Sequence, residues 1–292
     1  MKHIAILSLI CFCFFFSHAQ DPLDGFTQAY TEENANGYIS PLTDAFFTSL
    51  NTGVFPTSNA AEGLHIRVGV VGTMAFIPQS MKTFSATTEA PFRPEQTVEV
   101  PTVLGATDPV QVQGDNGTAY IFPTGFDVSS IPLAVPQAQI GNLFGTDFTF
   151  RYFAVSLDES IEDLSFFGLG VRHNFGRYFP DSTLDVNLAY MYQQFQVDDL
   201  IDARSNLIQV QVGQTLGIFS YYGVIGIVQG SFDLQYDHED SEGTTEINLD
   251  LENNNNLKIG AGAALQASIV NLHLEINVGS PTTIATGLAL GL

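Results

Sequence analysis

Apolar and polar residues alternate along residues 64–76. The even positions are apolar except at residue 72, and they are Leu64, Ile66, Val68, Val70, Met74 and Phe76. The odd positions begin with His65, Arg67 and Gly69. Because successive side chains of a strand point to opposite faces, this pattern predicts a strand with one apolar and one polar face. The segment is long enough to cross a bilayer core at a tilt, as strands of transmembrane barrels do.

The same alternation recurs from residue 146 to the end of the chain. The side chains expected to face lipid include Phe148, Phe150, Tyr152, Phe167, Leu169, Val171, Val186, Leu188, Tyr190, Tyr192, Ile208, Val210, Val212, Leu272, Leu274 and Ile276. Residues 219–236 keep one parity throughout, with Tyr222, Val224, Val228, Phe232, Leu234 and Tyr236 expected outside. That segment exceeds what a membrane needs, so its end is expected to project beyond the bilayer. Residues 257–267 and 283–292 complete the series.

The connections between these segments differ in charge. Residues 158–163, 198–202 and 237–256 are acidic, and they alternate with less acidic connections at 176–183, near Gly217 and near Val270. In an up-and-down barrel, every second connection lies on the same side. Outer-membrane barrels have long outer loops and short periplasmic turns, so the acidic side is predicted to be extracellular.

Residues 133–141 and 64–76 bring the number of predicted strands to about ten. Residues 78–130 are long for an unstructured loop, which leaves a lid, an inserted element or two further strands. Residues 97–103 and 110–112 resemble strands and keep a count of twelve open. The sequence therefore predicts an all-β fold, an antiparallel up-and-down transmembrane β-barrel of about 10–12 strands with a short N-terminal helix.

That helix is expected over residues 38–50. Apolar residues recur there with a helical period, Ser40 before Pro41 supplies a start signal, and Gly53 follows the end. Two roles remain open for the helix: a periplasmic element that covers the barrel mouth, and a plug inside the lumen.

Residues 1–19 have the three parts of a signal peptide: a basic start at Lys2, an apolar run over residues 4–16 and the small residue Ala19. Both cysteines, Cys11 and Cys13, lie in it, so the exported chain is expected to have no disulfide and no thiolate chemistry. We expect a signal peptide over residues 1–19, an N-terminal periplasmic segment with the helix over residues 20–62, and the barrel over residues 63–292.

Composition favours a barrel over a soluble exported protein. Only 14% of residues are charged, whereas soluble domains have about 25%. The chain also has 24 Phe and 10 Tyr, and a soluble fold would expose the predicted lipid-facing side chains as a large apolar patch. The formal net charge of −22 argues against nucleic acid as a partner, because few cations are available to neutralise phosphates.

Several motifs of this chain resemble those of an uncharacterised family of Gram-negative outer-membrane barrels, a domain of unknown function. They lie at residues 38–42, 50–53, 101–105, 131–137, 145–146, 151–152 and 168–173, and the most specific block reads Ile131-Pro132-Leu133-Ala134-Val135-Pro136-Gln137. The chain departs from many outer-membrane barrels by ending on Leu290-Gly291-Leu292 rather than on an aromatic residue. The resemblance implies a membrane location and no particular activity.

Ten titratable side chains are predicted to face the lumen. They are His65, Arg67, Asp147, Arg151, Arg172, Asp185, Asp233, Lys258, His273 and Glu275. One interpretation is a charged constriction that selects a permeant solute. The other is a network of ion pairs that fills a narrow barrel, since small barrels are largely closed by their side chains. Both remain open from the sequence.

Catalytic and metal chemistry finds little support. The histidines lie in separate segments without metal-ligand spacing, and no nucleophile elbow occurs, so neither a cofactor, a metal nor enzymatic activity is predicted. The leading hypothesis is an outer-membrane barrel for passive transport or binding of a small compound, hydrophobic compounds included. The alternative is a structural or adhesive surface barrel with acidic extracellular loops. The expected partners are outer-membrane lipid, lipopolysaccharide, the barrel assembly machinery and a small-molecule ligand.

Overall fold

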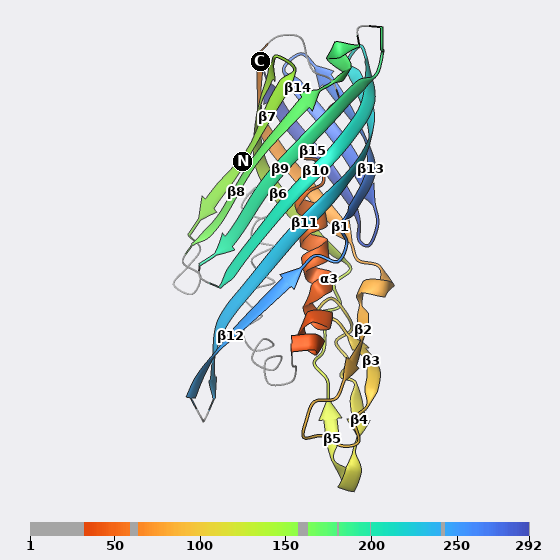
Figure 1. The fold of residues 1–292 in the computed structure, drawn as a ribbon, viewed down its shortest axis with the longest axis vertical. Helices are drawn as coiled ribbons and strands as arrows, with labels where there is room; N and C mark the ends of the chain where they lie inside the picture. The colour runs from red at the N-terminus through yellow and green to blue at the C-terminus, as the bar shows by residue number, and fades with distance from the viewer. Residues whose placement is uncertain are drawn as a thin grey trace.

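Ten antiparallel strands close into a barrel in the computed structural model, which describes residues 32–58, 64–156, 163–179, 181–198, 200–240 and 243–291 (Figure 1). The predicted signal peptide therefore lies outside the described residues. The wall strands are β1 (His65–Phe76), β6 (Ser130–Leu143), β7 (Thr146–Val155), β8 (Leu164–Asn174), β9 (Asp185–Val197), β10 (Ile201–Leu216), β11 (Phe219–Asp240), β13 (Leu257–Ala267), β14 (Val270–Val278) and β15 (Thr282–Gly291). The first and last strands, β1 and β15, pair with each other and close the wall. The predicted fold class is confirmed.

The alternation along the strands sorts the side chains between lumen and exterior as predicted. On β1, Arg67 is 8% exposed, whereas its neighbour Val68 is 60% exposed. The same contrast runs around the wall and gives a belt of exposed apolar side chains that includes Ile66, Val70, Phe167, Leu169, Leu188, Ile208, Val210, Ile225, Ile227, Ile259, Leu272, Leu274 and Leu288. This apolar belt is what a barrel surrounded by lipid requires.

Strand β11 is an exception, and there the predicted parity is wrong. Tyr222, Val224 and Phe232 are buried inside the barrel, while Ile225 and Ile227 face outward. Both faces of this strand are apolar, because one meets lipid and the other packs against a helix inside the barrel. The sequence alternation therefore could not identify the inner face.

The reversed parity of β11 corrects the placement of Asp233. This residue lies on the outer face, opposite Asp202 of β10 and Asp250 of β12 (Gly243–Glu252). It does not line the lumen. A hydrogen bond to Asp250, burial and the negative charge of Asp250 raise the pKa of Asp233 to about 6. The three aspartates lie beyond the apolar belt, where the outward residues of β10 become polar.

The two ends of the barrel differ. One end, here called the turn end, has the two-residue connections Phe144–Gly145, Gly217–Ile218 and Ser268–Ile269. The chain reverses there through positive φ angles at Phe144, Gly145, Gly217 and Ser268. The opposite end, called the lid end, has the connections that the sequence marks as acidic. The predicted segregation of connections is confirmed by the up-and-down order of the strands. Which end is extracellular stays a prediction.

Residues 77–129 form a small lid at the lid end (Figure 1). It contains two hairpins that are separate from the wall: β2 (Thr83–Thr87) with β3 (Thr97–Pro101), and β4 (Gln111–Gln113) with β5 (Ala119–Ile121). The lid also has two single 3-10 turns: η1 (Gln79–Met81) precedes β2, and η2 (Asp115–Gly117) lies between β4 and β5. A third, η3 (Gly176–Tyr178), lies at the turn end of the barrel. The strand-like stretches near residues 97 and 110 therefore belong to a lid and not to the barrel wall.

Residues 237–252, expected as a loop, instead extend the sheet. Strand β11 runs past the start of β13 and pairs with β12 as a hairpin. The predicted projection of this strand beyond the membrane agrees with its length and with its change of partner.

The N-terminal helix α3 spans Glu32–Leu50 and starts six residues earlier than the predicted residue 38. Pro41 lies inside it, and the hydroxyl of Ser40 donates to the carbonyl of Asn36 at 2.6 Å instead of capping an end. Within the described chain, no helix has the length and apolar character needed to cross a membrane.

Candidate functional site

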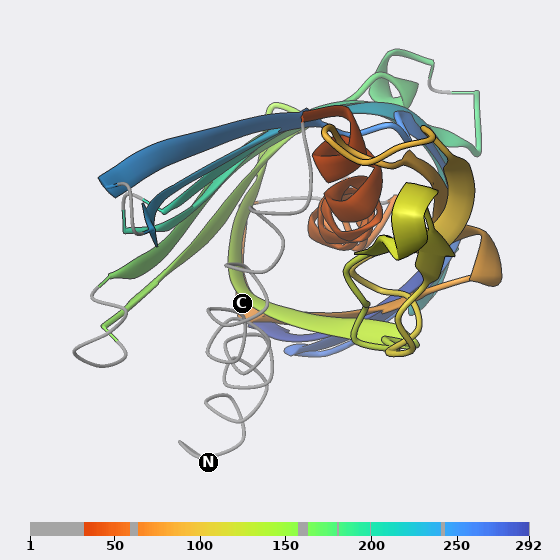
Figure 2. The same cartoon turned by 90° about the horizontal axis from the view of Figure 1, so that it is seen from below.

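Helix α3 and the extended residues 51–58 fill the barrel, and together they are called the plug here. Viewed from the lid end, the helix lies inside the ring of strands (Figure 2). Of the two roles that the sequence left open, the structure has the plug. Residues 51–58, called the lumen segment, continue from the helix through the lumen towards the turn end, where β1 begins.

The half of the lumen near the lid end is apolar and holds the helix. Phe46 packs against Phe195 of β9 and Phe232 of β11, with ring centroids 5.3 Å and 6.3 Å apart. Gly230 faces Phe47 so closely that a Cβ atom there would lie 2.6 Å from the ring. The absence of a side chain at this position thus makes room for the helix.

The lid holds the outer part of the helix. The Asn34 side chain donates to the carbonyl of Thr87 at 2.7 Å and accepts from its amide at 3.1 Å. The Tyr38 hydroxyl donates to the carbonyl of Thr124 at 2.7 Å, and its own carbonyl accepts from the amide of Val103 at 3.1 Å. The helix therefore contacts the wall at one end and the lid at the other.

The half of the lumen near the turn end is polar, and its side chains bind the main chain of the lumen segment. Barrel side chains donate to the carbonyl of Leu50, the last residue of the helix, and to those of residues 51, 54, 55, 57 and 58 of the lumen segment. These donors are Arg151, Gln193, Lys258, Gln137, Gln211, Arg172 and Asn187. An extended segment has no helix or sheet partner of its own, so these side chains supply the hydrogen bonds that buried carbonyls require.

Arg151 is 2% exposed and lies where the helix ends. Its guanidinium donates to the carbonyl of Leu50 at 2.7 Å, to Gln193 at 2.9 Å and to Gln137 at 2.8 Å. The C-terminal carbonyls of a helix lack intrahelical partners and carry partial negative charge, so a buried cation is favourable there.

Lys258 and Glu275 form a buried ion pair with a separation of 3.0 Å. The ammonium of Lys258 also donates to the carbonyl of Asn51 at 2.6 Å, and Glu275 accepts from the amide of Gly53 at 3.1 Å. The hydroxyl of Tyr222 donates to the second oxygen of Glu275 at 2.9 Å. Each charge of the pair thus contacts one residue of the plug.

Arg172 and Asp147 form a second buried ion pair nearer the turn end, with Nε and Oδ2 3.1 Å apart. Arg172 also donates to the carbonyl of Thr57 and, at 3.1 Å, to the amide oxygen of Gln211. The aromatic ring of Phe55 lies 6.0 Å from the guanidinium carbon. These contacts fix the last part of the lumen segment.

Nine of the ten predicted lumen residues lie on the inner face, and Asp233 is the exception. Arg67, Asp147, Arg151, Arg172, Lys258 and Glu275 are buried, whereas His65, Asp185 and His273 are partly exposed. The structure brings Arg151, Lys258, Arg172, Asp147 and Glu275 together around the plug. The prediction missed the role of the amides, Gln137, Asn187, Gln193, Gln209, Gln211 and Asn277, whose recurrence on inward positions was the available signal.

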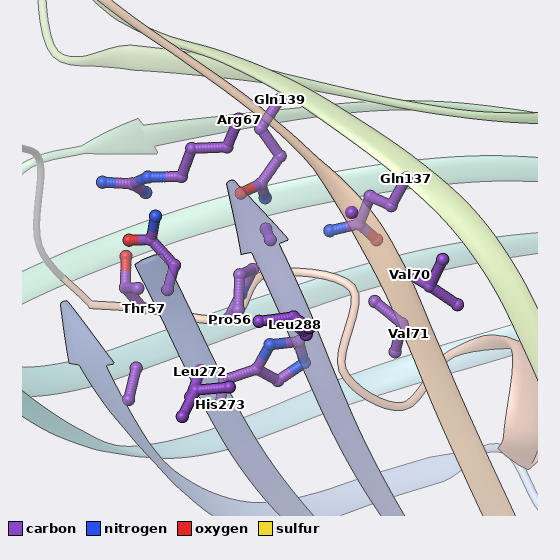
Figure 3. A pocket seen from close by; sticks show the side chains of 14 residues that line it. Pro56, Thr57, Arg67, Val70, Val71, Gln137, Gln139, Leu272, His273 and Leu288 are labelled. Carbon is purple, nitrogen blue, oxygen red and sulfur yellow. The ribbon is translucent and has the colours of Figure 1, made fainter. Parts of the chain in front are cut away.

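A small pocket lies between the lumen segment and the wall (Figure 3). The side chains of Arg67, Gln139 and Gln137 reach into it from β1 and β6, and His273 of β14 approaches from the other side. Pro56 and Thr57 of the plug also line it and lie between these two sides. Among the residues that the structure describes, no group of His, Cys, Asp and Glu side chains is arranged to hold a metal ion.

A model of the family described as a family of unknown function (DUF6588) matches residues 1–292. The chain belongs to this family. The resemblance inferred from the sequence motifs is confirmed. No curated protein matches the chain.

Solved structures similar to the chain are outer-membrane β-barrels. The transport unit of the autotransporter AIDA-I from Escherichia coli is 10% identical, with 90% of this chain and 98% of that chain covered and a TM-score of 0.31. The translocator domain of the autotransporter NalP from Neisseria meningitidis is 9% identical, with 79% and 88% covered and a TM-score of 0.28. The toluene transporter TodX of Pseudomonas putida is 9% identical, with 80% and 89% covered and a TM-score of 0.26. Likeness at this level says nothing about what this chain binds.

Proposed function

We propose that the chain is an outer-membrane barrel that binds or passively transports a small compound, hydrophobic compounds included, and that the plug closes its path at rest. The apolar belt supports the membrane location, because contiguous exposed apolar surface of this extent is unusual for a soluble monomer. The filled lumen argues against a permanently open pore.

The observation that carries the proposal is the way in which the lumen segment is held. Its main chain is bound by polar side chains of the wall, at carbonyls from Asn51 to Ser58. Water can take over such hydrogen bonds at little enthalpic cost, so a polar interface can separate and reform. Movement of the helix would uncover the apolar half of the lumen, which offers a surface for an apolar compound.

A disulfide that fixes the plug tests this proposal. A Cβ atom at Gly213 of β10 would lie 2.7 Å from that of Ser58 and would also overlap the carbonyl oxygen of Tyr221 on β11. Ser58→Cys/Gly213→Cys therefore needs both the plug and the β10 backbone to shift before the pair reaches disulfide geometry, and uptake is read only for variant protein that is a heat-modifiable folded barrel. Gram-negative cells expressing the variant would be exposed to the apolar dye N-phenyl-1-naphthylamine, and uptake would be followed by fluorescence. We expect uptake above that of empty cells with the unmodified chain, loss of the excess with the oxidised variant and recovery after reduction.

The matched control is Ala154→Cys/Ser165→Cys, a pair of neighbours on β7 and β8 that joins two wall strands without touching the plug. This control should leave uptake unchanged. In planar bilayers, the unmodified protein should give no steady open steps. If the folded protein neither raises dye uptake nor conducts, the transport proposal is wrong, and the alternative of a structural or adhesive surface barrel takes its place.

A further inference from the structure

Strands β6 and β7 of the barrel wall do not pair along their full length. Their ladder pairs residues 137–140 and 143 of β6 with residues 146 and 148–151 of β7. Within the described chain, residues 130–136 of β6 pair only with β1, and residues 152–155 of β7 pair only with β8. Figures 1 and 2 show the lid-end parts of β7 and β8 turning away from β6.

Two prolines in β6 lie at the point where the strands part. The amide of Ile77 donates to the carbonyl of Ser129, so hydrogen-bonded pairs between β1 and β6 fall on the odd residues of β6. The backbone groups of Pro132 and Pro136, on even positions, therefore point towards β7. Since proline has no N–H, these positions cannot donate to a ladder with β7, and proline in sheets is confined to such edges.

The inner surface behind this gap is apolar. Leu133 and Val135 of β6 point inward on one side. Phe153 of β7 points inward on the other and stacks on Phe166 of β8, with ring centroids 5.3 Å apart. On the outer face, the gap begins between Pro136 and Tyr152, at the edge of the apolar belt.

We propose that the gap between residues 130–136 of β6 and residues 152–155 of β7 is a lateral opening, through which small apolar molecules pass between the lumen and the hydrocarbon core of the membrane. Open sheet edges are costly in lipid because their backbone groups lack partners. Missing donors at Pro132 and Pro136 lower that cost on the β6 edge. The identity of the ligand class rests on the proposed function, but the existence of the opening does not.

The absence of tryptophan from the chain permits a direct test, since one introduced indole reports on one position. The probe variant is Phe153→Trp, reconstituted in vesicles of lipids with brominated acyl chains, which quench indoles in contact with them. We expect quenching equal to that of Phe167→Trp, an outward position that is 45% exposed in the belt. Phe55→Trp, inside the plugged lumen, should remain unquenched.

If Phe153→Trp does not give a heat-modifiable folded barrel, Phe166→Trp replaces it as the inward probe of the same apolar surface. Absence of quenching at the folded inward probe, with quenching at Phe167→Trp intact, overturns the proposal.

A disulfide across the gap gives a second, independent readout. Extending the register of the ladder places Ala134 opposite Ala154, both on the outer face. The oxidised pair Ala134→Cys/Ala154→Cys should join β6 to β7 across the gap. It should therefore abolish quenching at residue 153 and lower dye uptake to that of empty cells. The control Ala154→Cys/Ser165→Cys uses the same residue of β7 but joins it to β8, and it should change neither readout.

The two readouts separate this inference from the proposed function. Quenching at residue 153 without any dye uptake supports the opening and contradicts the transport proposal. Dye uptake that persists in the oxidised Ala134→Cys/Ala154→Cys variant overturns the lateral route and leaves transport through the lumen in place.

Discussion

The buried ion pair of Lys258 and Glu275 contacts the plug, and its contribution to the free energy of unfolding can be measured. The perturbation is Glu275→Met, which keeps the approximate volume and removes an acceptor of four hydrogen bonds. The donors that lose this partner are Lys258, Tyr222, Asn277 and the amide of Gly53, at 3.0, 2.9, 3.2 and 3.1 Å.

The expected magnitude follows from the burial of the pair. Glu275 is 0% exposed and Lys258 is 5% exposed, so removing the carboxylate leaves an ammonium without its countercharge in the lumen. Breaking a buried pair on one side costs about 3–5 kcal/mol, which is roughly two to four orders of magnitude in the folding equilibrium. The double variant Lys258→Met/Glu275→Met should cost less than Glu275→Met alone, because no unpaired charge remains.

The assay is urea unfolding in lipid vesicles, read from the heat-modifiable band on gels, for both single variants and the double variant. The control is Glu252→Met at an exposed position of β12, which should stay within about 0.5 kcal/mol of the unmodified chain. A cost below about 1 kcal/mol for Glu275→Met would refute the reasoning. So would a double variant whose cost equals the sum of the single costs, since contacting residues should couple.

Three further outcomes are expected in the same unfolding assay. Ile208→Lys places a charge in the apolar belt and should cost about 2–4 kcal/mol near the midplane of a bilayer, and a neutral result would argue that this face does not meet lipid. Gly230→Val should cost about 1–3 kcal/mol by forcing the ring of Phe47 and its helix away from β11, and unchanged stability would mean that the helix is not seated there. Asp250 and burial raise the pKa of Asp233 in the folded state to about 6, whereas its unfolded value is about 3.9. The folded state therefore binds the proton more tightly than the unfolded state, and the protein loses stability as pH rises from about 4 through 6. Asp233→Asn should therefore unfold at higher urea than the unmodified chain at pH 7 and not at pH 4, and equal midpoints at pH 7 would contradict this.

The sequence predicted the wall best where the two faces of a strand differ in chemistry. On β8 and β9, inward Arg172 and Gln193 alternate with outward Leu169 and Tyr192, so the period of two identifies the faces directly. On β11 the inner face is apolar because it meets Phe46 and not water. Alternation reports a difference between two environments, and here both environments are apolar.

The plug could be predicted only in part. The helical period of residues 38–50 showed that the helix has an apolar face, but this pattern does not state which surface covers it. The hydrogen bonds of Gln137, Gln193 and Gln211 to the lumen segment were equally out of reach. An inward amide in a strand is expected in any polar lumen, and its partner, a backbone carbonyl far away in sequence, leaves no mark on the local pattern.

The direction of the plug has a consequence for the order of assembly. The lumen segment precedes β1, and the wall is completed where β1 meets β15, which is the last strand of the chain. A cylinder closed first would have to admit the helix and the six plug carbonyls that the wall side chains bind through its own open end. The seam between the first and last strands therefore has to form around a chain already in place. The plug then serves as the template around which the wall strands assemble, and the pairing of β1 with β15 encloses it.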